Sequence, residues 1–288
     1  MDSSALQGQL YLVATPIGNL EDITLRAVRI LGEADIVAAE DTRHTRKLLS
    51  HLGLSKELWS YHQHSTTRVT EKIVEALQQG KNVALVSDAG MPCVSDPGQE
   101  LVAAVRREGL SITVIPGPSA ALSAYAVAGF ARDRFAFEGF LPTKQSERKQ
   151  RLVALQGEER TLIVYEAPHR LARTLQDLHG VLGNREATLV RELTKVHEEI
   201  LQSHLGDLVE LCATREPRGE YVIVIAGADV LSPPTENPDR AIETYRLLLG
   251  EGYSRGDALR EAARRSGLSR DSLYRLLSEA SEHAKSPS

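Results

Sequence analysis

The stretch NVALVSDAGMPCVSDPG, residues 82–98, runs from an apolar segment into a turn rich in Gly, Pro, Ser and Asp. The segment VIPGPSA, residues 114–120, repeats this arrangement, and a helix-like segment follows each turn. In an open α/β sheet, ligands bind beyond the carboxyl ends of the strands, where small residues let backbone N–H and C=O groups approach closely. The two turns therefore predict an α/β fold with a site for a small polar ligand that carries adenosine.

Short apolar runs alternate with helical stretches over residues 10–118, which is typical of parallel βαβ units. The clearest helix is expected at 68–79, with Gly80 at its end. Its apolar face consists of Val69, Ile73 and Leu77. The expected strands are LYLVA, ADIVAA, NVALVS and ITVIP, then RFAFEGF, TLIVYE, EATLVREL and EYVIVIAG, with the helical run HRLARTLQDLHGVL in the second group.

The chain is expected to form two α/β domains, residues 1–118 and 119–230, followed by a linker at 231–238 and a helical domain at 239–288. The linker is predicted from the prolines and turn formers of LSPPTENPD. A length of 288 residues with 42% hydrophobic side chains is enough for about two such cores.

In the helical domain, Ser254 and Ser269 are expected N-caps and Gly267 an expected helix stop. The turn SGLS resembles that of a helix-turn-helix. Two apolar stripes are expected, one of Ile242, Tyr245 and Leu249 and one of Leu273, Leu276 and Leu277. Residues 239–285 contain nine Lys or Arg and eight Asp or Glu, so this segment is nearly neutral. Its charge alone therefore favours a packing module over a nucleic-acid-binding module.

Composition excludes several classes of protein. Cys93 and Cys212 are far apart and predict neither a disulfide framework nor a zinc site, which favours the cytoplasm. No apolar run approaches the roughly 18 residues of a membrane span, and no signal peptide is expected. A net charge of −5 means that any RNA contact must come from a local basic patch.

The common phosphate, nucleotide and nucleophile motifs are absent. The sequence has no GxxxxGK[ST], no GxGxxG and no GxSxG. His62 and His64, with His44 and His51 upstream, have no acidic or Cys partner at ligand spacing. No metal site is therefore expected.

Eight segments in order carry a family resemblance: LVATPIGNLEDIT, AAEDTRHTRKLL, SDAGMPCVSDPG, PGPSA, FEGFLPTK, YEAPHRL, RELTKVHEE and GEYVIVI. Together they resemble the tetrapyrrole methylase superfamily and, within it, the 16S ribosomal RNA small subunit methyltransferase I family. That family 2′-O-methylates a cytidine in the decoding region. Met91 departs from the usual SDAGTP, so a side-chain hydroxyl contact is lost there while a backbone contact would survive.

The resemblance implies S-adenosylmethionine as methyl donor, bound in a trough between the two α/β domains, and a homodimer. The implied cofactor residues are Pro16, Ile17, Asp88, Gly90, Met91, Val94, Ser119, Ala120, Tyr165, Glu192, Leu193, Glu220, Tyr221 and Val222. Capping or core packing is the alternative role for Asp88, Ser119, Tyr165 and Val222.

A ribose hydroxyl is a poor nucleophile, so a general base should help its methylation. Glu40, Glu192 and Lys195 are candidates because they lie in polar turns beside the motifs. Asp41 is a fourth, although a helix N-cap is its expected role.

The expected RNA contacts centre on EDTRHTRKLL, where Arg43, Arg46 and Lys47 lie on one helix face. Leu48 and Leu52 would form the opposite, apolar face. The patch could extend to Lys144, Arg170, Arg191 and Lys195. The expected partner is 16S rRNA within the small ribosomal subunit.

Three alternatives stay open: a methyltransferase acting on a precorrin-like ring, a metabolite-sensing regulator that binds DNA through its tail, and a catalytically inactive scaffold. The basic helix and the tail argue against the first, because a small macrocycle needs neither. The near-neutral tail argues against the second.

Overall fold

The computed structural model describes residues 7–63, 65, 67–130, 133–228, 238–250, 253–266 and 270–283. The chain divides into two compact units between Ala228 and Asp229. The expected linker lies outside the described residues except for Pro238, where the first helix of the second unit begins. Gly267 and Ser269 also lie outside them.

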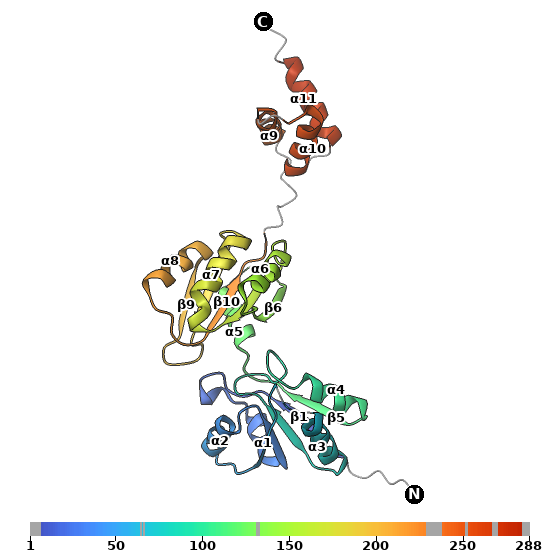
Figure 1. Ribbon diagram of the computed structural model, residues 1–288, viewed down its shortest axis with the longest axis vertical. Helices are drawn as coiled ribbons and strands as arrows, with labels where there is room; N and C mark the ends of the chain where they lie inside the picture. Colours follow the sequence, from blue (N-terminus) through green and yellow to red (C-terminus); the bar gives the residue numbers. More distant parts are fainter. Residues whose placement is uncertain are drawn as a thin grey trace. The chain divides into compact units, whose positions relative to one another are not determined.

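The first sheet of unit 1 is parallel, with strand order β3-β2-β4-β1-β5 (Figure 1). Its strands are β1 (Gln9–Val13), β2 (Ile36–Ala39), β3 (Glu57–Ser60), β4 (Val83–Val86) and β5 (Ser111–Ile115). Every residue of β2 and β4 is buried, because helices cover both faces of the sheet. The four expected strands of this part are confirmed, and β3 is an additional, half-exposed edge strand.

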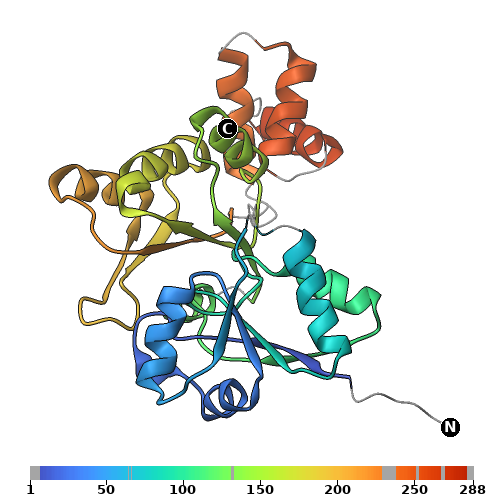
Figure 2. The same cartoon turned by 60° about the horizontal axis from the view of Figure 1, so that its bottom comes forward.

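Helices α1 (Leu25–Glu33) and α2 (Thr42–His51) cover one face of this sheet, and α3 (Thr67–Gln78) and α4 (Gln99–Arg107) cover the other. Figure 2 shows the first pair in blue and the second in cyan to green. A short 3-10 helix, η1 (Leu20–Asp22), precedes α1. Asp41 caps α2 by accepting the Arg43 N–H, and α3 confirms the helix expected at 68–79.

The second sheet has the order β6-β7-β10-β8-β9 and is mixed. Its strands are β6 (Phe135–Phe140), β7 (Thr161–Glu166), β8 (Glu186–Arg191), β9 (Glu199–His204) and β10 (Tyr221–Ile225). Strand β6 is parallel to β7, while β10 is antiparallel to β7 and to β8. Helix α5 (Ala120–Ala128) covers one face, and α6 (Gln145–Ala154), α7 (Pro168–Leu182) and α8 (Leu205–Thr214) cover the other.

Unit 2 contains the helices α9 (Pro238–Gly250), α10 (Arg255–Ser266) and α11 (Arg270–His283). Its small core includes Leu248, Leu259 and Leu273, and the two expected apolar stripes pack against or within it. Ser254 caps α10 by accepting the Asp257 N–H at 3.2 Å, as expected. Among the described helices of the chain, none is long and apolar enough to cross a membrane.

Candidate active site

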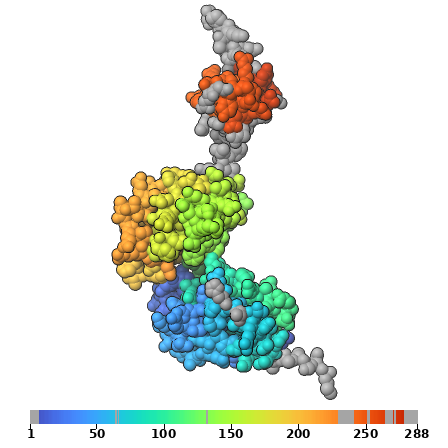
Figure 3. Space-filling view, viewed as in Figure 1, coloured from blue at the N-terminus to red at the C-terminus, as the bar shows by residue number. Residues whose placement is uncertain are grey.

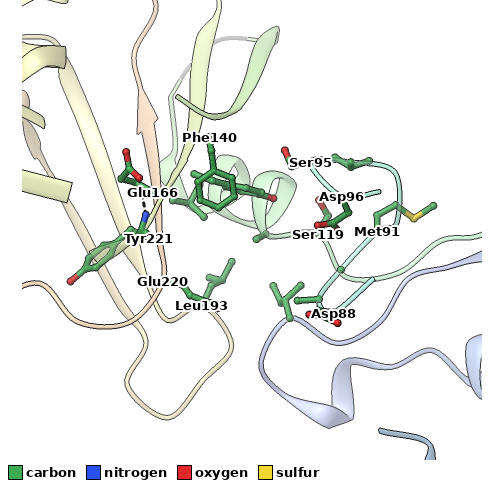
Figure 4. Close-up of a pocket in the computed structure, with 18 of the residues that line it drawn as sticks. Asp88, Met91, Ser95, Asp96, Ser119, Phe140, Glu166, Leu193, Glu220 and Tyr221 are labelled. Atoms are coloured by element: carbon green, nitrogen blue, oxygen red, sulfur yellow. Dashed lines mark hydrogen bonds between the residues drawn. The ribbon is translucent and has the colours of Figure 1, made fainter. Parts of the chain in front are cut away.

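A cavity of about 410 Å³ lies between the two α/β domains of unit 1. Its first wall is formed by the segments that follow β1, β2, β4 and β5, at the carboxyl edge of the parallel sheet. Its second wall is formed by the ends of β6, β7 and β8 and the start of β10. Figure 3 shows the indentation where the domains meet, and Figure 4 shows the lining side chains. The lining residues are Ile17, Glu40, Asp88, Ala89, Gly90, Met91, Val94, Ser95, Asp96, Ser119, Ala120, Phe140, Tyr165, Glu166, Ala167, Pro168, Val190, Leu193, Glu220, Tyr221 and Val222.

Two loops of the first wall are hydrogen-bonded to each other. The Thr15 N–H donates to the Gly90 carbonyl at 2.9 Å, and the Gly90 N–H donates to the Thr15 carbonyl at 3.1 Å. Gly90 has φ +84°, and a Cβ there would lie 3.3 Å from Cγ2 of Ile17. Glycine is therefore needed at residue 90 both for the turn and for the close approach of the two loops.

The turn after β4 is held in an unusual backbone conformation. Cys93 and Ser95 have φ values of 69° and 62°, in the left-handed region that non-glycine residues rarely occupy. Gly98 has φ 137°. Such strain is commonly found where a protein holds a ligand. Here the turn directs Ser95 and Asp96 toward the cavity (Figure 4).

Five carboxyl residues line the cavity, and three of them, Glu40, Asp88 and Asp96, lie on its first wall. Burial raises the pKa of Glu40, and the nearby charge of Asp88 adds to this effect. Burial also raises the pKa of Asp96 to about 6, with the charges of Glu40 and Asp88 acting in the same direction against a hydrogen bond from Ser87. Oδ1 of Asp88 accepts the Asp41 N–H at 3.1 Å. The cavity therefore concentrates negative charge that a cationic ligand would relieve.

The second wall is built on Tyr165. Its ring makes edge-to-face contacts with Phe137 and Phe140, with centroid separations of 5.0 and 5.6 Å. Its hydroxyl accepts the Ala121 N–H at 3.0 Å, and burial raises the pKa of Tyr165. The side chain of Ser119 makes no capping hydrogen bond at the start of α5. Ser119 and Ala120 line the cavity, so the amino end of α5, with its partial positive charge, borders it.

The loop after β8, in the second domain, contacts the first domain. Nζ of Lys195 lies 2.9 Å from both Oε1 of Glu192 and Oε2 of Glu220. Burial alone would raise the pKa of Glu192, but hydrogen bonds from the Glu220 backbone and Lys195 lower it below its usual value. The N–H of Asn19 donates to Oγ1 of Thr194 at 3.2 Å. The loop is therefore fixed against the first domain beside the cavity.

A sequence model of the family described as Tetrapyrrole (Corrin/Porphyrin) Methylases matches residues 9–209. The chain belongs to the tetrapyrrole methylase family. A protein of Synechocystis sp. named Ribosomal RNA small subunit methyltransferase I is 47% identical over 270 residues, which are 93% of this chain and 97% of that protein. A protein of the same name from Escherichia coli O157:H7 is 43% identical over 277 residues, with coverage of 95% and 96%.

Solved structures of tetrapyrrole methylases share the fold. The uroporphyrin-III C-methyltransferase of Thermus thermophilus, complexed with S-adenyl homocysteine, aligns with a TM-score of 0.56 at 23% identity, covering 76% of this chain and 97% of that one. The methyltransferase CobJ aligns with a TM-score of 0.59 at 20% identity, covering 77% and 95%. The family, the fold class and the methyltransferase class expected from the sequence are confirmed.

Most of the cofactor residues expected in this tetrapyrrole methylase line the cavity together. The exceptions are Pro16, which is buried, and Glu192, which is bound to Lys195 and to the Glu220 backbone. Met91 lines the cavity and packs against the core of the first domain. The sequence did not single out Ala89, Ser95, Asp96, Phe140, Glu166, Ala167, Pro168 or Val190. Asp96 and Phe140 do lie within the quoted motifs SDAGMPCVSDPG and FEGFLPTK, which were the available signal.

Of the four candidate bases, the structure brings only Glu40 into the cavity. Glu192 and Lys195 form an ion pair in the loop after β8 instead. The capping role expected for Asp41 is confirmed, and hydrogen bonds from Arg43 hold the pKa of Asp41 well below its usual range.

The expected RNA-binding residues fall into two groups. Arg43, Arg46, Lys47 and Lys144 are exposed. Arg43 is paired with Asp41 and Lys144 with Glu147. By contrast, Arg170 and Arg191 are largely enclosed and donate to the protein's own carbonyl and carboxylate groups, and Lys195 holds the interdomain loop. Only the exposed group is therefore accessible to an RNA phosphate.

Within the part of the chain that the structure describes, no three His, Cys, Asp or Glu side chains come together as a metal site would require. His64, one of the four histidines considered above, lies outside that part.

Proposed function

We propose that this chain transfers a methyl group from S-adenosylmethionine to the ribose 2′-hydroxyl of a cytidine in the decoding region of 16S rRNA. The small ribosomal subunit supplies the substrate, and the reaction takes place in the cytoplasm. The observation that carries the proposal is the acidic, partly apolar cavity at the carboxyl edge of the sheet, in a chain 41–47% identical to rRNA methyltransferases I.

The lining residues fit each part of the cofactor. Asp88 and its acidic neighbours suit the ammonium and sulfonium cations, and the amino end of α5 suits a carboxylate. Leu193 and Val222 offer apolar contacts for an adenine ring. When bound, the cofactor supplies an already activated methyl group on its sulfonium. The protein then contributes mainly by positioning the acceptor.

Methyl transfer from labelled S-adenosylmethionine to 30S subunits that lack 2′-O-methylation tests the proposal. Label on the ribose of a single cytidine is expected. Label on a precorrin-like ring but not on RNA would favour the small-molecule alternative. Cofactor binding without transfer to either acceptor would favour a scaffold.

The exposed face of α2 is the proposed RNA contact. Arg46 and Lys47 lie on it, and its opposite face is buried through Leu48. The N-cap of the helix is Asp41, whose N–H donates to Oδ1 of Asp88 in the cavity. Phosphates bound by α2 would therefore lie next to the reaction site.

We expect a variant carrying both Arg46→Ala and Lys47→Ala to bind 30S subunits about tenfold more weakly and to lower the slope of log K against log salt by roughly 1.5–2. The measurement is a filter-binding salt titration. The matched control carries Arg106→Ala and Arg107→Ala at the exposed end of α4, on the opposite face of the same sheet. Equal losses in both variants would contradict a specific contact at α2.

We propose that the chain forms a homodimer through the exposed face of α5. This helix is apolar on its outer side as well, with Leu122 53% and Val127 45% exposed. We expect light scattering to give about twice the chain mass of 31.6 kDa. Leu122→Asp should yield a monomer, because a charge cannot be buried unpaired in an interface. Val153→Asp, at an equally exposed apolar position on α6, should leave the mass unchanged; a monomeric wild type would refute the dimer.

A further inference from the structure

Glu166 is a buried carboxylate at the end of β7, on the second wall of the cavity (Figure 4). Its Oε1 accepts the Ala167 N–H at 2.9 Å, and its Oε2 accepts the Thr174 hydroxyl at 2.6 Å. Nε of Arg170 lies 3.2 Å from Oε1 of Glu166. A carboxylate that is enclosed in this way needs a counter-charge, and Arg170, one turn along α7, supplies it.

The other nitrogens of Arg170 hold the connection between β6 and α6. Nη2 donates to the carbonyls of Leu141 at 2.6 Å and of Pro142 at 3.4 Å, and Nη1 donates to Oγ1 of Thr143 at 3.4 Å. The side chain of Arg170 is only 18% exposed, so these donors are directed into the protein. A guanidinium presents its donors in a rigid plane, and it can therefore bind a carboxylate and neighbouring carbonyls in fixed directions.

A second arginine, Arg148, binds the same segment. Its Nη1 donates to the carbonyls of Pro142 at 3.2 Å and of Thr143 at 3.0 Å, while Nη2 is paired with Asp177. Each carbonyl from Leu141 to Thr143 thus accepts a hydrogen bond from an arginine that a buried carboxylate fixes in turn. The segment 141–143 is therefore held in one conformation by side chains of α6 and α7.

This segment joins the cavity to a surface cation. Phe140 precedes it and lines the cavity, and Lys144 follows it as the N-cap residue of α6. The Lys144 side chain is 74% exposed, and its Nζ lies 3.1 Å from Oε1 of Glu147. An exposed ion pair of this kind contributes little, so a phosphate can replace Glu147 as the partner of Lys144. Because the segment is fixed, the position of Lys144 relative to the cavity is fixed as well.

We propose that Arg170 is a positioning residue for the RNA, which fixes the segment 141–143 so that Lys144 holds one phosphate of the substrate at a set place relative to the cavity. The inference rests on the proposed function. It adds a phosphate contact in the second domain to the contact at α2 in the first. Phosphate contacts set the register and orientation of a bound nucleic acid, so contacts in both domains present the acceptor ribose to the cavity in one orientation.

The variants Lys144→Ala and Arg170→Lys test the inference. Loss of one phosphate contact in Lys144→Ala should weaken binding of 30S subunits about 3- to 10-fold and lower the slope of log K against log salt by about 1. Arg170→Lys should give the same two changes, because it keeps a cation beside Glu166 but lacks the planar fork that holds the segment. KM for 30S subunits should rise in both variants while kcat stays near the wild-type value. Full binding by Arg170→Lys would overturn the inference.

A double-mutant cycle separates positioning from a general structural role. If Arg170 acts through Lys144, the variant that carries both substitutions should bind no more weakly than the weaker of the two single variants. If Arg170 only stabilises the fold, the two losses multiply and Arg170→Lys keeps the wild-type salt slope. Either of these results would contradict the inference. Arg170→Lys suits this test because it retains the counter-charge of the buried Glu166, which Arg170→Ala would remove.

The matched control is Arg185→Ala. Arg185 is also a half-buried arginine, and it donates to the carbonyls of Leu182 and Glu158 at the opposite end of the same sheet. This variant should keep the wild-type salt slope. Titration calorimetry with S-adenosylhomocysteine should give the wild-type Kd for Arg170→Lys. A weaker cofactor Kd with an unchanged salt slope would make Arg170 a support of the cavity wall and overturn the inference.

Failure of the inference and failure of the proposed function give different results. The salt titration measures binding alone and requires no methyl transfer, so it tests Arg170 directly. A wild-type protein that binds cofactor yet methylates no cytidine ribose would refute the proposed function itself.

Discussion

Asp88→Ala is expected to weaken S-adenosylmethionine binding about 10- to 100-fold and to reduce methyl transfer at least as much. Asp88 is one of the three carboxyl groups on the first wall of the cavity, and its Oδ1 accepts the Asp41 N–H. A hydrogen bond between charged groups contributes about 1.5–3 kcal/mol, which corresponds to this change in affinity. Titration calorimetry and transfer of labelled methyl to 30S subunits measure the two effects.

The variant Asp88→Asn distinguishes the effect of the carboxylate charge on cofactor binding from the effect of the side chain on the conformation of the turn. Asparagine retains an oxygen that can accept the Asp41 N–H but carries no charge. If the carboxylate binds the cationic cofactor, both variants lose affinity. Recovery of full affinity in Asp88→Asn would show that Asp88 only orders the turn, and the cofactor would then have to be held by Glu40 and Asp96.

Asp177→Ala should lower the free energy of unfolding of unit 1 by about 3–5 kcal/mol. Asp177 and Arg148 form an ion pair in which the side chains are only 6% and 4% exposed. Nε and Nη2 of Arg148 lie 2.9 and 2.7 Å from Oδ2 of Asp177, and Nη1 donates to the carbonyls of Pro142 and Thr143. Removal of Asp177 leaves a buried guanidinium without its counter-charge, which costs far more than the net contribution of the pair.

Urea denaturation followed by circular dichroism measures this loss. The matched control is Glu147→Ala, which removes the exposed ion pair with Lys144 on the same helix and should cost less than about 1 kcal/mol. Equal shifts in the two variants would contradict the buried pair as the cause. Because Arg148 also holds the carbonyls of Pro142 and Thr143, next to the proposed RNA contact Lys144, Asp177→Ala should weaken binding of 30S subunits in addition.

Local sequence patterns predicted the strands that consist of continuous apolar runs. The runs VALV of β4 and YVIVI of β10 are continuous and apolar because both faces of each strand are covered. The half-exposed ELWS of β3 and the alternating EILQSH of β9 were missed, since edge strands carry fewer buried residues. Helices α6 and α8 were also missed, because α6 buries only Arg148 and Leu152 and α8 only Leu205 and Leu208.

The amino-acid sequence by itself determined the family, the parallel first sheet, the N-caps of α2 and α10 and most members of the cavity wall. These features depend on residue order and on contacts a few positions apart, such as the hydrogen bond from the Arg43 N–H to Asp41. Only the tertiary structure decided that Glu192 and Lys195 pair with each other beside the cavity, that Arg170 and Arg191 are enclosed, and that Asp96 and Phe140 line the same cavity from different domains. The physical reason is that side-chain direction and burial follow from strand pairing and domain packing, and local periodicity carries no information about those contacts.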